Sequence, residues 1–286
     1  MSPRHTAAAL LIAAIWGFNF TAIRLGLDEM TPLAFAGWRF VVAALPALFI
    51  PFPAVSWRAL AGIGVFLFTG QFVLLFFAMQ AGLPPGLTSV LVQLQGPLTF
   101  VLAALFLRER ASPGQWLGLA IALAGVIVIA RSIEGTASVL AVLVALLSAL
   151  SWAIGNLFLR EARGAPIIAI TVWSSLLPPG PLLLAGIAID GAGPTFAPFL
   201  APTWQGWVAL LYSVVPVMWL GYWLWGTLLR SYPAAKAGPV SLLVPCFALG
   251  FAALVVSEPL GGLRLAGVVV VLGGVALGLF ASLKRV

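Results

Sequence analysis

The sequence predicts an all-α integral membrane protein with ten transmembrane helices, arranged as two inverted five-helix repeats around a central cavity. Three observations support this prediction: the composition, ten long apolar runs, and residues that recur at a fixed spacing. Of the 286 residues, 63% are hydrophobic and only 7% are charged, whereas a soluble domain carries about 25% charged residues. The mean hydropathy of +1.16 leaves too little polar surface to face water, so lipid must be the solvent.

Ten apolar runs are long enough to be spans, because a helix that crosses about 30 Å of hydrocarbon needs roughly 20 apolar residues. They are 6–26, 33–51, 58–79, 86–107, 115–131, 137–159, 166–188, 204–228, 235–256 and 263–283. Lipid offers no partner for open backbone groups, so each run is expected to be helical.

Proline and glycine mark the breaks between these runs. Pro51 and Pro53 follow the second run, Pro84-Pro85-Gly86 separates the third from the fourth, and Ser112-Pro113-Gly114 opens the fifth. Proline removes a backbone donor and turns the chain, which suits helix ends. The stretch from Gly191 to Pro202 is predicted to be the longest loop, and no connection has room for a soluble domain.

The basic residues predict the orientation of the chain in the membrane. If both termini lie inside, ten Lys and Arg residues fall on the inner side and four on the outer side. The outer four are Arg24, Arg39, Arg131 and Arg264. Because positive charge favours the cytoplasm, the sequence predicts an inner-membrane protein with both termini cytoplasmic.

Residues recur between the two halves of the chain. Three of them return 149 positions later, namely Glu109, Gly118 and Gly125 as Glu258, Gly267 and Gly274. Trp16 and Asn19 return as Trp152 and Asn156, at spacings of 136 and 137. We therefore expect two fused halves, 1–134 and 135–286, with five spans each. An odd number of spans turns the second copy upside down, and inverted repeats suit alternating access to a central site. Duplication retained only for packing is the alternative.

Several short motifs stand in a fixed order in each half. The first half holds Trp16-Gly17-Phe18-Asn19-Phe20, Pro32, Arg39, Pro97, Leu107-Arg108-Glu109-Arg110, Gly118 and Gly125. The second half holds Pro245, Ser257-Glu258-Pro259, Gly267 and Gly274. Together these motifs resemble the drug/metabolite transporter superfamily in its EamA-type branch, although Pro259 stands where the family has an arginine. The resemblance covers nearly the whole chain and implies ten helices, an inverted repeat, a central cavity and export of metabolites such as amino acids.

Polar side chains within apolar spans are expected to face the bundle interior, because lipid cannot satisfy them. Asn19 and Asn156 lie near the middle of their spans and at equivalent positions of the repeat. They are candidates to bond a polar group of the substrate, and hydrogen bonding between helices is the alternative.

Further interior candidates are Gln71, Gln93, Gln95 and Ser241. On a continuous helix, two residues that are two positions apart point in different directions, so only one of Gln93 and Gln95 is expected to face the cavity squarely. Pro97 and Pro245 are predicted structural or hinge residues. Each frees a carbonyl one turn earlier, which either serves as an acceptor in the cavity or simply accompanies a kink.

One cation and several rings complete the candidate site. Arg39 lies inside the second run and is a candidate to hold a carboxylate, since a guanidinium pairs well with planar anions. The alternative is an arginine that reaches the interface or ties helices together. Aromatic candidates for stacking on a flat substrate lie deep in their runs, and core packing is their alternative. These are Trp16, Trp152, Tyr212 and Trp219.

The acidic residues limit the mechanism. All seven lie at span ends or in loops: Asp28, Glu29, Glu109, Glu134, Glu161, Asp190 and Glu258. A proton relay normally needs a carboxylate at mid-membrane, and small multidrug exporters of the same superfamily use a glutamate in the first helix, which this chain lacks. The charge distribution therefore favours a neutral or zwitterionic solute and a weakly coupled or uniport cycle.

The resemblance implies export of small metabolites, foremost amino acids, and the deep aromatic rings favour aromatic ones among them. The partners predicted are a small-molecule substrate and the lipid bilayer. The basic residues are scattered rather than clustered, so no nucleic acid is expected. The sequence holds one histidine, His5, and no metal-ligand spacing, so we expect no enzyme, cofactor or metal. The alternatives are an exchanger of anionic metabolites or nucleotide sugars, for which only Arg39 and Lys236 supply cavity cations, and a membrane enzyme or scaffold.

Overall fold

The computed structural model describes residues 2–106, 112–132, 139–201, 203–232 and 238–283, and within these ranges the secondary structure is helical, without strands. In these ranges eight helices are long and apolar enough to cross a membrane, and two shorter apolar helices lie at 32–48 and 240–256. The ten apolar runs of the sequence overlap these ten segments. Glu109 with its flanking arginines, and Lys236, lie outside the described residues.

The first half of the chain contains the elements up to α7. They are α1 (Pro3–Gly26), α2 (Pro32–Ala44), η1 (Leu45–Leu48), α3 (Trp57–Gly62), η2 (Ile63–Gly70), α4 (Gln71–Gln80), α5 (Pro85–Val92), α6 (Gln95–Phe106) and α7 (Pro113–Ser132).

The second half follows with the elements from α8 to α16. They are α8 (Val139–Glu161), α9 (Ile167–Ser174), α10 (Pro179–Ile189), α11 (Ala192–Leu200), α12 (Trp204–Val214), η3 (Val215–Gly221), α13 (Tyr222–Ser231), η4 (Gly238–Leu242), α15 (Leu243–Val256) and α16 (Gly262–Leu283).

Several helices begin at a side-chain cap. Ser2, Thr31 and Ser56 each accept a hydrogen bond from a backbone N–H in the first turn of α1, α2 and α3. Proline is the first residue of α1 and of α2, where its missing N–H needs no partner. These caps explain why the apolar runs begin as helices at these residues.

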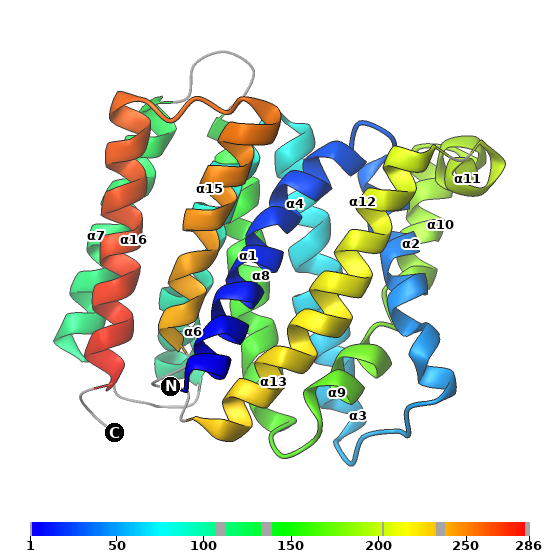
Figure 1. The fold of residues 1–286 in the computed structure, drawn as a ribbon, viewed down its shortest axis with the longest axis horizontal. Coiled ribbons are helices and arrows are strands. Elements are labelled where there is room, and N and C mark those ends of the chain that lie inside the picture. The colour runs from blue at the N-terminus through cyan, green and yellow to red at the C-terminus, as the bar shows by residue number, and fades with distance from the viewer. Residues whose placement is uncertain (1, 107–111, 133–138, 202, 233–237, 284–286) are drawn as a thin grey trace.

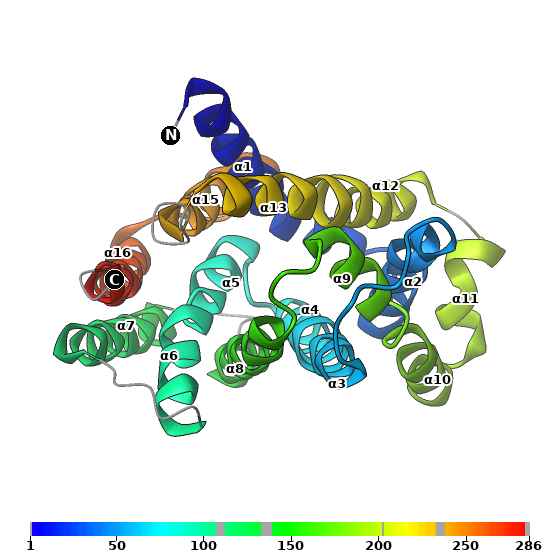
Figure 2. The ribbon, with the colours of Figure 1, turned by 90° about the horizontal axis from the view of Figure 1, so that it is seen from below.

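The helices run up and down, and α1 begins at the same end of the bundle at which α16 ends (Figure 1). We call this end the termini end. In both views α7 and α16 lie side by side at one edge of the molecule, whereas α2 and α10 lie toward the other edge (Figures 1 and 2). Between them, α1 packs on α15 and α12, and α4 packs on α8.

Two long helices contain a π-helical segment near their centres. Segment η2 joins α3 to α4, and segment η3 joins α12 to α13. Side chains donate to carbonyls within both segments: the Ser151 hydroxyl donates to the Phe66 carbonyl at 2.7 Å, and the Trp16 indole N–H donates to the Val217 carbonyl at 3.2 Å. Segments of this kind are frequent at functional sites.

The prediction of a loop from Gly191 to Pro202 was wrong, because this stretch contains α11. The Trp38 and Trp207 indole N–H groups donate to the carbonyls of Thr195 and Pro198, at 2.8 and 3.0 Å. Thr195 and Pro198 are buried, and α11 contacts α2 and α10. Tertiary contacts therefore override the local preference of a segment rich in glycine and proline.

Candidate functional site

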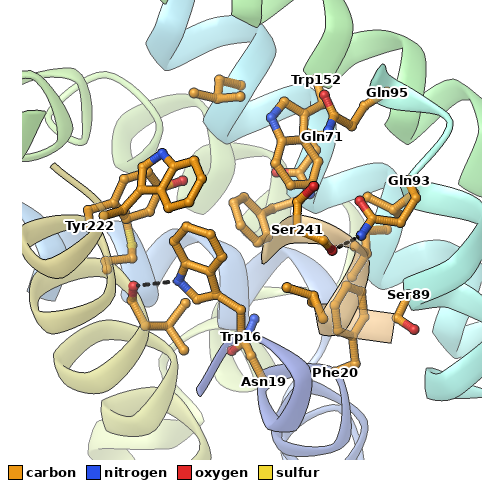
Figure 3. A pocket seen from close by; sticks show the side chains of 18 of the residues that line it. Trp16, Asn19, Phe20, Gln71, Ser89, Gln93, Gln95, Trp152, Tyr222 and Ser241 are labelled. Carbon is orange, nitrogen blue, oxygen red and sulfur yellow. Dashed lines mark hydrogen bonds between the residues drawn. The ribbon is translucent and has the colours of Figure 1, made fainter. Parts of the chain in front are cut away.

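A cavity of about 280 Å³ lies within the bundle, lined by helices from both halves of the chain. Nine of the eleven predicted substrate-binding residues line it. They are Trp16, Asn19, Arg39, Gln71, Gln93, Gln95, Trp152, Asn156 and Ser241. Figure 3 shows Trp16, Trp152 and Tyr222 around one space, with the amides of Gln71, Gln93 and Gln95 on one side of it.

Trp16 is at the centre of an aromatic wall. Its ring lies 5.7 Å from the rings of Tyr222 and Trp225, both of which line the cavity. A Cβ on Gly221 would lie 2.5 Å from the Trp16 indole nitrogen, so only glycine leaves room for this ring. The wall therefore depends on a glycine in η3.

The two asparagines each hold a neighbouring helix through one end of the amide. The Asn19 carbonyl oxygen accepts a hydrogen bond from the Ser213 hydroxyl at 3.0 Å. The Asn156 amide group donates to the Gln95 carbonyl oxygen at 2.8 Å and to the Thr99 hydroxyl at 3.1 Å. Both asparagines also line the cavity, and the hydrogen bonds described use only one end of each amide, so bonding between helices and bonding to a solute are compatible.

Gln93 and Gln95 both line the cavity, which corrects the expectation that only one of them would. The reason is that the helix is interrupted: α5 ends at Val92 and α6 begins at Gln95, with a turn between them. The spacing rule for a continuous helix does not apply across this break.

The two predicted hinge prolines occupy matching places. Pro97 is the third residue of α6, and Pro245 is the third residue of α15, each shortly after a break. The Ser241 carbonyl, one turn before Pro245, accepts a hydrogen bond from the Gln93 side chain. A carbonyl that proline leaves without its helical donor therefore joins the two halves of the chain at the cavity.

Arg39 is fully buried near the middle of the second span, and it lines the cavity. Its guanidinium carbon lies 3.8 Å from the centre of the Phe72 ring and 5.7 Å from that of Phe40. None of its three side-chain nitrogens has a hydrogen-bond partner among the described residues. It therefore neither reaches the interface nor ties helices together by hydrogen bonds.

Two predicted residues lie outside the lining. The Tyr212 hydroxyl donates to the Ile15 carbonyl at 3.1 Å, and its ring packs edge-on against Phe18. The Trp219 indole donates to the Ala43 carbonyl at 3.3 Å. Both residues join helices.

Most of the other lining residues are apolar or aromatic side chains that the sequence did not single out, among them Phe72, Tyr222 and Trp225. Tyr222 and Trp225 are three positions apart in α13, so they share a helix face, and this spacing is a signal that the sequence offered. Nothing in the sequence distinguishes Phe72 from its apolar neighbours. Among the described lining residues there is no acid, and no group of three metal-ligating side chains occurs in the described part of the chain.

Comparison with known proteins places this architecture in a family. The model of the EamA-like transporter family matches residues 6–131 and again residues 139–280. A protein of Salmonella typhimurium called a probable amino-acid metabolite efflux pump is 36% identical, over 100% of this chain and 98% of its own length.

Two further relatives agree with this match, and one solved structure shares the fold. A protein of the same description from Escherichia coli is 34% identical, over 98% of this chain and 96% of its own length, and the Bacillus subtilis transporter YvbV is 30% identical, over 95% and 91%. A crystal structure aligns with a TM-score of 0.61 at 16% identity, covering 97% of this chain and 98% of the other. The chain therefore belongs to the EamA-like transporter family.

Proposed function

We propose that this protein is a secondary transporter of the inner membrane that exports small metabolites, foremost amino acids, by alternating access. The observation that carries the proposal is the cavity within the membrane-spanning bundle, with amides and aromatic rings from both halves of the chain in its wall. The name of the Salmonella and Escherichia relatives, probable amino-acid metabolite efflux pump, supports the substrate class.

The proposed architecture is ten spans in two inverted halves, 1–134 and 135–286. The two separate matches of the family model support this division. The π-helical segments η2 and η3 also lie in the third and the eighth span, which are equivalent in such a repeat. Asn19 and Asn156 likewise line one cavity from the first and the sixth span.

Alternating access is supported by different contacts at the two ends of the bundle. The lining includes Leu159 and Ile167, which lie close to the termini end. At the opposite end, the Glu258 carboxylate accepts hydrogen bonds from the backbone N–H groups of Gly86 and Leu87, at 2.7 and 3.2 Å. We propose that this contact between the halves belongs to a closed outer gate.

The function is tested by flux into liposomes that contain the purified chain. Uptake of the twenty standard amino acids and of sugar nucleotides is measured with and without a pH gradient. We expect at least one amino acid to cross, at a rate that does not depend on the gradient, because no acid was found among the described lining residues. Product formation without flux would support an enzyme, and flux of sugar nucleotides alone would support an anion exchanger.

Replacement of the asparagines tests the site. We expect Asn19→Ala and Asn156→Ala each to lower the flux about tenfold, the effect of losing a hydrogen bond worth about 1.4 kcal/mol. Ser213→Ala is the matched control, since it removes the helix partner of Asn19 and leaves the amide in the cavity. Equal losses in Asn19→Ala and Ser213→Ala would reduce Asn19 to a structural residue.

A further inference from the structure

Arg39 is the one fully buried charged side chain in the described part of the chain, and it has no described partner. The described ion pairs lie elsewhere, between exposed or half-exposed side chains: Arg24 with Asp28 and Arg58 with Glu161. Buried polar groups are nearly always hydrogen-bonded, so an unpaired guanidinium in this position requires an explanation.

The surroundings of Arg39 offset only part of the free-energy cost of burying its guanidinium. Phe72 and Phe40 present their rings to the guanidinium, and such contacts attract a cation. The rings cannot accept its five N–H donors in the planar geometry that a guanidinium prefers. A carboxylate can do so, because two of these donors match its two oxygens in a bidentate pair.

We infer that Arg39 is the anion subsite of the cavity and binds the carboxylate of the exported solute. This inference rests on the proposed function and makes its substrate class narrower. The solute must carry a carboxylate, and a compound with only a positive charge is excluded, because it would meet an unpaired guanidinium in the wall. The aromatic wall of Trp16, Tyr222 and Trp225 supplies ring faces for the ammonium group or the side chain of the same solute.

Access to Arg39 requires a movement of its neighbour. The side chain of Arg39 is 0% exposed, and the Phe72 ring, which also lines the cavity, lies against the guanidinium. A rotation of this ring away from the guanidinium would open the subsite to a carboxylate. The solute therefore displaces a cation–π contact and replaces it with a charge-assisted pair, which is the stronger of the two.

The test measures binding to the full-length chain in lipid nanodiscs by titration calorimetry. The probes are the twenty standard amino acids and, for each, its carboxamide, which keeps the shape and loses the negative charge. For the amino acid that binds most tightly, we expect the carboxamide to bind at least tenfold more weakly. In Arg39→Gln this preference should vanish, and in Arg39→Lys it should be intermediate, because lysine keeps the charge without the fork of donors.

Two controls separate this role from a structural one. Arg58→Gln removes the same charge from an exposed position and should keep the preference for the acid. Replacing an arginine with a structural role would lower the unfolding temperature. The unfolding temperature of Arg39→Gln should instead equal or exceed that of the wild type, because the substitution removes a buried unpaired charge. An unfolded Arg39→Gln protein would contradict the inference.

The outcomes distinguish the inference from the proposed function. Equal binding and equal flux of an amino acid and its carboxamide in the wild type would overturn the anion subsite and leave the transporter intact. Tight binding that depends on Arg39, without flux in liposomes, would support the subsite and overturn the transporter. Binding of no amino acid, or a preference that persists in Arg39→Gln, would also overturn the subsite.

Discussion

At the scale of single residues, the polar groups of the cavity serve the fold and the site at the same time. Asn19, Asn156 and Gln93 each use one end of an amide to hold another helix. Amides suit this purpose because each has both donors and an acceptor, so one hydrogen bond does not exhaust them. Arg39 differs from these residues, since none of its donors is used by a described residue.

Glu258 lies outside the spanning segments, between α15 and α16, and it is the buried carboxylate that joins α15 to the first turn of α5. Burial raises the pKa of this carboxyl above its ordinary value of 4.5, while the N–H groups of Gly86 and Leu87 and the charge of Arg264 oppose the shift. A carboxyl with a raised pKa binds its proton more tightly in the folded protein than in the unfolded chain. Its contribution to stability is therefore present below pH 4.5 and is lost as the pH rises through the raised pKa.

The raised pKa of Glu258 predicts how the stability of Glu258→Gln compares with that of the wild type. The amide does not titrate, so the unfolding temperature of the wild type should fall relative to that of Glu258→Gln as the pH rises from 4.5 toward neutrality. The measurement is the unfolding temperature of both proteins from about pH 4 to about pH 8. Glu258→Ala is the control, and it should be less stable than Glu258→Gln at every pH by about 1 kcal/mol, because it leaves the first turn of α5 without a cap. If the unfolding temperature of the wild type instead rose relative to that of Glu258→Gln with rising pH, burial would not be the dominant effect on the pKa of Glu258.

At the scale of elements, the recurring glycines have a common purpose. Those of α7 and α16 meet each other: a Cβ on Gly118 would lie 2.6 Å from the Gly274 carbonyl, and a Cβ on Gly125 would lie 3.0 Å from the Gly267 carbonyl. Small residues let two helices approach closely within a membrane, where no hydrophobic force drives them together. The glycines that recur in the sequence therefore form the two facing surfaces of one helix pair.

Replacement of Gly118 tests this packing. Gly118→Ala should lower the free energy of unfolding by about 1–3 kcal/mol, since the added methyl group meets backbone atoms that cannot turn aside. Gly273→Ala is the matched control in α16, because a Cβ there would have no atom within 4 Å. The measurement is chemical unfolding in mixed micelles. If both variants had equal stability, the close contact of α7 with α16 would not limit stability.

The sequence predicted the apolar helices, and nine of its eleven candidate residues line the cavity, each for a physical reason. Lipid forces apolar runs of this length to be helical, and it forces polar side chains such as Asn19 and Gln71 inward. The rotation of each helix about its own axis was harder to predict from the sequence. Tyr212 and Trp219 lie outside the cavity lining, whereas Tyr222 and Trp225 lie within it. Segment η3 lies between Tyr212 and Tyr222 and changes the number of residues per turn, so α-helical spacing does not predict which rings face inward.

At the scale of the whole molecule, corresponding connections of the two proposed halves lie at opposite ends of the bundle. In the proposed repeat, α8 is the counterpart of α1. The connection after α1 lies at the end opposite the termini, whereas the connection after α8 lies at the termini end (Figure 1). A membrane that surrounds the bundle between these ends would place the two connections on opposite sides. This is the geometric content of an inverted repeat, and it can be measured in intact cells.

Four single-cysteine variants test this arrangement, each in a chain with Cys246→Ser, which removes the native exposed thiol. Glu29→Cys and Glu161→Cys probe the connections after α1 and α8, which the proposed repeat makes equivalent. Ala54→Cys lies between η1 and α3, and Gly193→Cys lies in α11, between α10 and α12. All four native residues are exposed and none is basic, so the substitutions leave the charges that set the orientation in place. We expect a membrane-impermeant maleimide to label Glu29→Cys and Gly193→Cys in intact cells, and Ala54→Cys and Glu161→Cys only after permeabilisation. The reverse pattern would keep the inverted repeat and place both termini outside, whereas labelling of Glu29→Cys and Glu161→Cys from the same side would exclude the inverted repeat itself.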